Sequence, residues 1–353
     1  MIERFIVSRD DSIYEAFPDV ALTPSGRLVC VFMECTHHRD RSYTNNMVTT
    51  SDDRGRTWSP KRALTEELRG DPKAGDPSWD CPRVTQLSDG RLVSVVNRMR
   101  YEDRERSNWI MFSSDDGETW TEPAETPVIG IVPDQIVELK AGPHAGRWLT
   151  GAHRSEGEDD GRTWHVRWWY SDDAGQSWSG PVTVAHVKGL RLCEGSLVEL
   201  ATGELVVFMR ENSHRGRGAF KSVSRDGGET WSEPVEFPLP GCHRPVAGVL
   251  ASGKIMITHR FCQGGEGWIG WWTQNFFAAT TDVESCLAGD YMEAHTRIMP
   301  LDFDRHHESD CGYSGWVQFD DGEIYVVSYI MDDAPNGHIR GYSFREEDLL
   351  IEP

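Results

Sequence analysis

A short motif recurs four times along the chain and restricts what the chain can fold into. In each copy an Asp-rich turn leads to a tryptophan: SDDRGRTW (51–58), SSDDGETW (113–120), SDDAGQSW (171–178) and SRDGGETW (224–231). Ser and Asp side chains bond the amides of such a turn, glycine takes a positive φ, and tryptophan packs under the hairpin. The four copies therefore predict four β-hairpins closed in the same way.

A second, longer repeat has the pattern strand, glycine turn, strand. Its second strand is apolar at nearly every position, as expected when both faces are covered by neighbouring sheets. The repeats predict an all-β fold, a six-bladed β-propeller of four-stranded antiparallel blades, as one domain over residues 1–353. The N-terminal run RFIVSR is long enough to supply the outer strand of the sixth blade, which would leave no long edge exposed. The six copies are FPDVALTPSGRLVCVFME (17–34), CPRVTQLSDGRLVSVVNR (81–98), VPDQIVELKAGPHAGRWLTGAHR (132–154), CEGSLVELATGELVVFMR (193–210), RPVAGVLASGKIMITHR (244–260) and GYSGWVQFDDGEIYVVSY (312–329).

The tryptophan turns resemble the Asp-box (S-x-D-x-G-x-T-W) of the sialidase-type propellers. On this motif and the six hairpins, the chain is similar to the sialidase (neuraminidase)-like superfamily of BNR, or Asp-box, propellers. The resemblance covers essentially the whole chain and implies the same fold. In such propellers the Asp-boxes lie on the outer rim, so we interpret them as structural turns. The fifth hairpin is followed by a degenerate box, TTDVESCLAGD.

Composition narrows the possible partners. Lys and Arg number 36 and Asp and Glu number 57, which gives a net charge of −21. This charge argues against general binding to nucleic acid or to anionic membranes. We expect a cytoplasmic protein, secreted only if a leader has been removed, because no signal peptide or long apolar run is present. The 8 cysteines include no CxxC pair, so we expect no disulfide scaffold, no metal and no cofactor.

The hairpins also predict where chemistry can sit. In a propeller the first residues of each inner strand and the last residues of its partner converge at one face. Four of the six blades contribute at least one arginine to these positions. Guanidinium groups bind carboxylate, sulfate or phosphate, which predicts a pocket for an anion, although the same arginines could instead pair with acids and connect the blades. The positions are Asp19, Arg83, Asp134, Glu194, Arg244 and Tyr313 at strand starts, and Glu34, Arg98, His153-Arg154, Arg210-Glu211, His259-Arg260 and Tyr329 at strand ends.

Glu194 and Tyr313 are a candidate catalytic pair. A phenol is a poor nucleophile at neutral pH unless a base takes its proton. At these two residues the chain resembles the sialidases. In that family a tyrosine of the last blade attacks the anomeric carbon with a glutamate as its base. The resemblance implies that Tyr313 is the nucleophile, Glu194 its base and Arg210 one of three arginines that grip the sugar carboxylate.

The loop THHRDRSYTNN resembles the family's first-blade loop that carries an acid/base aspartate. Asp40 fits that place loosely, and it could equally be a solvated loop residue. Two family features are missing: YEAFPDV has no arginine at the first blade, and GWIGWWTQN has none at the fifth. We predict that the substrate is bound by Arg210, Arg244, Arg260, Arg83, Arg98, Arg154, Asp134 and His243.

These residues favour an exo-acting glycoside hydrolase that removes a terminal acidic or unusual sugar, with a carbohydrate as partner. Two alternatives stay open. The propeller could bind glycans without catalysis, or it could run another reaction, such as a lyase or a glycosidase that uses His and carboxylates. No helical HExxH spacing exists, so histidines such as His243 are expected to contact sugar hydroxyls or to position arginines. The sugar, its linkage and the oligomeric state do not follow from the sequence.

Overall fold

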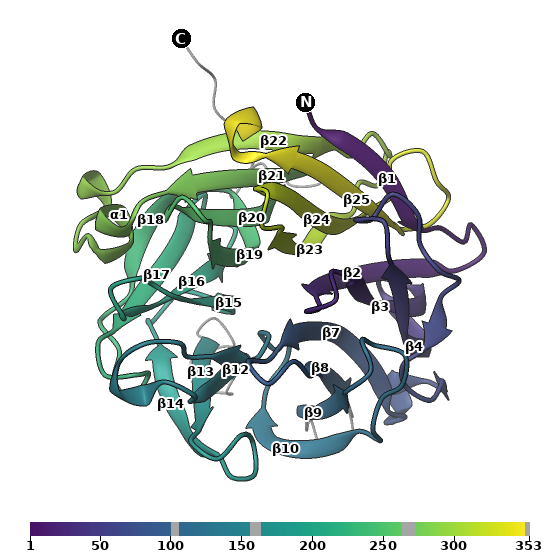
Figure 1. Ribbon diagram of the computed structural model, residues 1–353, viewed down its shortest axis with the longest axis horizontal. Coiled ribbons are helices and arrows are strands. Elements are labelled where there is room, and N and C mark those ends of the chain that lie inside the picture. Colours follow the sequence, from purple (N-terminus) through teal and green to yellow (C-terminus); the bar gives the residue numbers. More distant parts are fainter. Residues whose placement is uncertain (100–105, 156–163, 263–272, 350–353) are drawn as a thin grey trace. The chain divides into compact units, whose positions relative to one another are not determined.

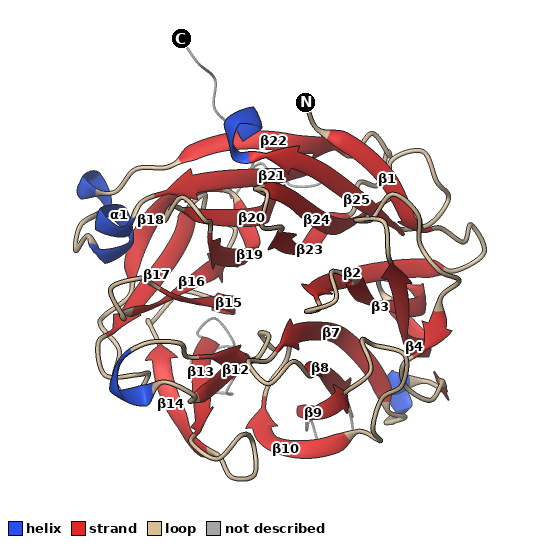
Figure 2. Cartoon of the chain, in the orientation of Figure 1, coloured by secondary structure: helices blue, strands red, loops and turns tan. Residues whose placement is uncertain are grey.

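The computed structural model describes residues 1–99, 106–155, 164–262 and 273–349. Six antiparallel sheets account for most of the strands, which confirms the predicted fold class. The chain divides into two compact units, Met1–Gln135 with Phe303–Pro353 (unit 1) and Ile136–Asp302 (unit 2). Each unit contains three of the sheets (Figures 1 and 2). That the chain is one domain stays a prediction.

Unit 1 holds the first, second and sixth sheets. In the sixth sheet the N-terminal strand β1 pairs with β25 (Figure 1, purple beside yellow), and this pairing covers the outer edge of β25. The first sheet is β2 (Tyr14–Leu22), β3 (Leu28–His37) and β4 (Asp40–Ser51), with β5 (Arg62–Ala63) and β6 (Leu68–Arg69) both paired to β4. The others are β7 (Ser78–Gln86), β8 (Leu92–Met99), β9 (Arg106–Ser113) and β10 (Ala124–Ile129), then β23 (Cys311–Gln318), β24 (Glu323–Ile330), β25 (His338–Arg345) and β1 (Glu3–Ser8).

Unit 2 holds the third, fourth and fifth sheets. Its first strand, β11, has only 2 residues, so Asp134 precedes the strand that was expected to begin near it. The sheets are β11 (Val137–Glu138), β12 (Trp148–Ser155), β13 (Trp164–Ser171) and β14 (Ser179–Ala185); β15 (Leu192–Glu199), β16 (Leu205–Glu211), β17 (Gly218–Ser224) and β18 (Val235–Pro240); and β19 (Cys242–Val249), β20 (Ile255–Cys262), β21 (Gln274–Thr281) and β22 (Arg297–Phe303).

Helices are few and short. Helix α1 (Val283–Leu287) occupies the degenerate fifth box, where Asp282 caps its N-terminus by accepting a hydrogen bond from the Ser285 amide. Within the described ranges no helix is long and apolar enough to cross a membrane. Among the described residues, short 3-10 helices lie at Pro72–Ala74, Gly142–His144, Tyr291–Glu293 and Glu346–Leu349.

The four tryptophan turns adopt the predicted geometry. In the first, the Asp53 carboxylate accepts hydrogen bonds from the Thr57 amide at 2.8 Å and from its hydroxyl at 2.6 Å. The Ser51 hydroxyl accepts one from the Gly55 amide, and the indole of Trp58 donates to the Gly55 carbonyl at 3.1 Å. The carboxylates of Asp115, Asp173 and Asp226 accept the corresponding amide and hydroxyl hydrogen bonds in the other three turns. They are local bonds within a turn, which is why the sequence could predict them.

In five sheets a residue near the start of the first strand has positive φ, and in the third sheet such a residue, Val132, precedes β11. Around this residue the pairing of five first strands with their neighbours shifts register, as in a β-bulge. Proline follows in four cases, and a residue ahead of proline is biased toward extended backbone, so the surrounding sheets must impose the left-handed conformation. The residues and their φ values are Phe17 (57°), Cys81 (41°), Val132 (55°), Glu194 (49°), Arg244 (50°) and Gly312 (104°).

This repeated bulge corrects the alignment of the strand starts. Asp19, Arg83 and Asp134 lie two residues after the left-handed position, Tyr313 lies one residue after it, and Glu194 and Arg244 occupy it. The predicted set therefore mixes three register positions. Because successive side chains of a strand point to opposite faces, residues at different positions cannot all serve one site in the same way.

The position two residues after the bulge connects adjacent sheets. Asp19 accepts hydrogen bonds from the amides of Val20 and Val84, both at 3.0 Å, and its Oδ2 lies 3.2 Å from Nε of Arg83. Arg83 also donates to the Ser314 carbonyl at 2.8 Å. Asp19 and Arg83 are 1% and 2% exposed. Arg83 thus takes the sheet-connecting role that was the alternative to substrate binding, and its burial does not favour contact with a substrate.

Asp19→Asn should destabilise the protein by about 3 kcal/mol, because it leaves the buried Arg83 cation without its counter-ion. The measurement is equilibrium denaturation of the purified variant. Asp52→Asn is the matched control: Asp52 also pairs with an arginine, Arg27 at 2.7 Å, but its side chain is 72% exposed. That change should cost less than about 1 kcal/mol. Equal losses for the two variants would contradict the connecting role of Asp19.

Candidate active site

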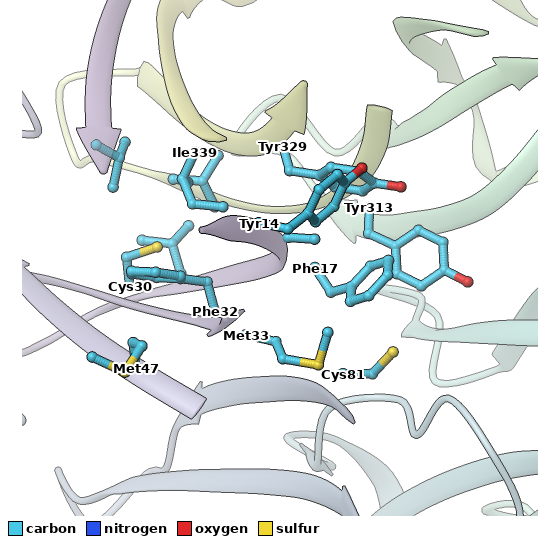
Figure 3. Close-up of a cluster of buried hydrophobic side chains, with 14 of the residues drawn as sticks. Tyr14, Phe17, Cys30, Phe32, Met33, Met47, Cys81, Tyr313, Tyr329 and Ile339 are labelled. Atoms are coloured by element: carbon cyan, nitrogen blue, oxygen red, sulfur yellow. The ribbon is translucent and has the colours of Figure 1, made fainter. Parts of the chain in front are cut away.

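Tyr313 lies at the start of β23 in a cluster of aromatic side chains in unit 1. Its ring centroid is 4.8 Å from that of Phe17 and 6.4 Å from that of Tyr329. The residue is 7% exposed. Figure 3 shows its ring against Phe17 with the hydroxyl turned away from the buried cluster. The phenol is therefore held by packing while its oxygen lies at the edge of the apolar core.

Phe17 is the residue that brings this cluster together. Its ring centroid lies 5.2 Å from those of Tyr329 and His38, and the guanidinium carbon of Arg41 lies 5.3 Å from it. Phe17 itself has the left-handed backbone described above. Non-glycine residues in this region cost roughly 1–3 kcal/mol and concentrate at functional sites. The strain at Phe17 therefore places a ring where four other side chains meet it.

Asp310, just before β23, is a carboxylate with several donors. The hydroxyl of Tyr14 donates to its Oδ2 at 2.5 Å and that of Tyr329 to its Oδ1 at 2.8 Å. Nδ1 of His38 also bonds Oδ2. Burial, followed by the charge of Asp310, raises the pKa of Tyr14 well above its ordinary value. Sequence reasoning missed Asp310, although it stands in the polar run DRHHESD directly before CGYSGW.

The predicted acid/base residue Asp40 lies apart from this cluster's hydrogen bonds. It begins β4 in an exposed hairpin and accepts a hydrogen bond from the Ser42 amide at 2.9 Å. The backbone and side-chain hydrogen bonds from Ser42 lower the pKa of Asp40. A general acid needs a proton near neutral pH. The surroundings of Asp40 are those of a turn residue, and they do not favour the acid role.

Arg41, the next residue, is buried against the aromatic cluster. Its guanidinium donates to Sγ of Cys35 at 2.8 Å and lies 3.6 Å from the carboxylate of Asp80. Burial alone lowers the pKa of Arg41, but Asp80 and Cys35 outweigh it and raise the pKa above its ordinary value. An arginine thus reaches the first-blade Phe17 from the neighbouring β4, where the sequence pattern YEAFPDV has none.

In unit 2, Glu194 and Arg210 form an ion pair. Nη1 of Arg210 lies 2.8 Å and 3.0 Å from the two carboxylate oxygens of Glu194, and Nη2 donates to Asn212 at 2.6 Å. The two side chains of the ion pair are 7% and 11% exposed. The Glu194 amide donates to Nδ1 of His153 at 3.3 Å. Arg210 thereby stabilises the charged carboxylate, which is the form that can accept a proton.

A positive environment surrounds His243 in the same unit. Burial, then the charges of Arg210 and Arg260, lower the pKa of His243 well below its ordinary value. Arg260 donates to Gln274 at 3.2 Å and is 6% exposed. Burial and Arg210 also lower the pKa of His214, whose ring centroid is 6.0 Å from that of His243. Two arginines around neutral imidazoles suit an anionic group.

The other predicted binding residues are not part of these two clusters. Arg244 is fully buried and donates to the Gly195 carbonyl at 3.1 Å. The Arg98 guanidinium carbon lies 5.2 Å and 5.4 Å from the ring centroids of Trp79 and Trp109. Arg154 is exposed near the end of β12, and Asp134 is buried. Their substrate contacts stay predictions, and burial argues against one for Arg244.

The described side chains include no group of three or more His, Cys, Asp or Glu that could hold an ion. All eight cysteines are buried, and none of them forms a disulfide. The stretch GWIGWW (267–272), which lacks the arginine that the sialidase resemblance implies for the fifth blade, lies outside the described residues.

Comparison with known proteins places these residues in context. The anhydrosialidase of the leech Macrobdella decora is 30% identical over 143 residues, which are 40% of this chain and 17% of the leech protein. A Dyadobacter fermentans protein of unknown function superposes with a TM-score of 0.77 at 20% identity, over 98% of this chain and 99% of its own. The Ruminococcus gnavus intramolecular trans-sialidase superposes with a TM-score of 0.72 at 15% identity, over 96% of each chain.

The structural matches show the propeller fold, whereas a match of the sequence to a family model shows the family. The model of the BNR repeat-like domain matches residues 72–326, which is more than half of the chain. This range includes three of the four tryptophan turns and the candidate nucleophile Tyr313. The chain therefore belongs to the BNR repeat-like domain family, as a sialidase-like β-propeller.

Proposed function

We propose that this propeller is a glycoside hydrolase of the sialidase-like kind that removes a terminal acidic sugar. The observation that carries the proposal is the placement of Tyr313. A nearly buried phenol is held by Phe17 and Tyr329, at the position that the sialidase resemblance assigns to the nucleophile. The partial identity to a leech anhydrosialidase supports the same class of reaction.

The proposed chemistry is nucleophilic catalysis by the phenol. The Tyr313 oxygen attacks the anomeric carbon, and the carboxylate of Glu194 accepts the phenolic proton. Glu194 is suited to a base because Arg210 stabilises its charged form. Tyr313 belongs to unit 1 and Glu194 to unit 2, so their partnership rests on the sequence repeats.

The acidic character of the sugar is inferred from unit 2. Arg210 and Arg260 act together on His243, and both lower its pKa. A carboxylate bound there would receive charge-assisted hydrogen bonds, which are the strong ones. Arg260 lies beside the same histidine as Arg210 and is largely buried, so we expect it to contribute to the recognition of a negative charge.

Tyr313→Phe tests the nucleophile. Removal of the hydroxyl should lower kcat on an activated aryl glycoside by at least about 100-fold, because the covalent step is lost. Tyr325→Phe is the matched control: its hydroxyl donates to the Gly55 carbonyl at 2.8 Å, within a tryptophan turn. The control should lose about 1 kcal/mol of stability and keep its kcat. Equal kcat in wild type and Tyr313→Phe would refute the nucleophile.

Arg260→Gln tests the preference for an acid. Titration calorimetry would compare N-acetylneuraminic acid with its methyl ester, which keeps the hydroxyls and loses the charge. Wild type should favour the acid by roughly 10- to 100-fold, the range of one charge-assisted hydrogen bond, and Arg260→Gln should lose this preference. The control Arg225→Gln removes an arginine whose side chain is 65% exposed and should keep it. An unchanged preference in Arg260→Gln would speak against the assignment.

A further inference from the structure

His38 lies against the ring of Phe17, which also packs against Tyr313. It lies in the turn between β3 and β4, and its Nδ1 bonds Oδ2 of Asp310. The His38 side chain is 34% exposed and that of Asp310 is 15% exposed. An imidazole that uses Nδ1 for a carboxylate keeps Nε2 for proton exchange. This is the arrangement of an oriented acid/base histidine.

The carboxylate of Asp310 is held in place from several sides. Tyr14 and Tyr329 donate their hydroxyls to it. The Asp310 amide donates to Oδ2 of Asp304 at 2.9 Å, and the same Asp304 carboxylate accepts from the amides of His306 and Asp332. The segment before β23 is thus fixed by these hydrogen bonds, and His38 gains a defined orientation from it.

The imidazole and the phenol lie against the same ring. The centroid of Phe17 is 5.2 Å from His38 and 4.8 Å from Tyr313. The ionisable groups that face His38 from the packed elements are Asp310 and Tyr14, whose ring centroid is 6.3 Å away. Arg41 lies over Phe17 from β4. A sugar bound at Tyr313 would therefore have His38 as its proton donor, in place of Asp40.

We propose that His38 is the acid/base residue of the hydrolysis and that Asp310 is its positioning residue. This inference rests on the proposed function. In the first half-reaction, Nε2–H gives its proton to the glycosidic oxygen as the bond from that oxygen to the anomeric carbon breaks. The Tyr313 oxygen forms the new bond to the anomeric carbon, and its phenolic proton passes to the carboxylate base, Glu194 in the proposed function.

In the second half-reaction the neutral imidazole takes a proton from water. The resulting hydroxide oxygen bonds the anomeric carbon, and the bond from this carbon to the Tyr313 oxygen breaks. The phenol recovers its proton from the carboxylate base. The net reaction adds one water across the glycosidic bond, and His38, Tyr313 and the base all return to their starting states. No oxidant, metal or cofactor enters the balance.

The test uses the different needs of two leaving groups. An alkyl sugar leaving group needs protonation, whereas an aryl leaving group departs without it. The probes are 3′-sialyllactose and the 4-methylumbelliferyl α-sialoside. His38→Gln should lower kcat/KM by about 100-fold or more on the trisaccharide and by less than about 10-fold on the aryl sialoside. Asp310→Asn should show the same inequality in weaker form.

The controls separate this role from structure. His37→Gln and Asp40→Asn change the neighbouring polar residues of the same turn, and both should leave the ratio of the two activities unchanged. His38→Ala should regain activity on the trisaccharide when free imidazole is added, which a merely structural defect would not allow.

The outcomes divide clearly. Equal losses on both probes in His38→Gln, or a leaving-group effect in Asp40→Asn, would overturn the role of His38 and leave the proposed function standing. Absence of wild-type turnover on both sialosides, and also on aryl β-D-glucuronide and aryl α-L-arabinofuranoside, would overturn the proposed function together with the inference. A selective loss on the trisaccharide with imidazole rescue would support both.

Discussion

The left-handed residue at or before the start of each first strand is the constraint on which the arrangement of this site depends. Five non-glycine residues there have φ between 41° and 57°, a conformation that costs roughly 1–3 kcal/mol for each. The pairing of β2 with β3 shifts register between Ala16 and Asp19. This shift lets Phe17 meet Tyr313 and His38 while Asp19, two residues later, bonds the Val84 amide of the next sheet. One backbone feature therefore both connects neighbouring sheets and positions Phe17 against Tyr313 and His38.

The two units supply different chemical groups. Unit 1 gathers a phenol, an imidazole and a carboxylate around the ring of Phe17, with hydroxyls of Tyr14 and Tyr329 fixing the carboxylate. Unit 2 gathers a glutamate paired with Arg210 and a buried histidine whose pKa is lowered by two arginines. The first set can attack and transfer protons, and the second can hold negative charge.

The sequence predicted the fold well because its signals are local. Hydrogen bonds within the turn close each Asp53-type box, and the glycine turns mark each hairpin, so repeats alone revealed six sheets. The site was harder to predict, because bulges leave no clear mark in the sequence. Glu194 and Arg244 were aligned with Arg83, although the bulge separates their positions by two residues. Arg41 and Asp310 were missed because they reach Phe17 and His38 from a neighbouring strand and a loop, through contacts that spacing does not encode.

The most direct measurement of the central claim is to trap the glycosyl-enzyme. The protein would be incubated with 2,3-difluorosialic acid, in which the ring fluorine slows hydrolysis of the intermediate, and then digested and mapped by mass spectrometry. The account predicts a covalent sugar adduct on the peptide that contains Tyr313, located on its phenolic oxygen and absent in Tyr313→Phe. An adduct on Glu194 or another carboxylate, or turnover of the fluorosugar without any adduct on Tyr313, would contradict it.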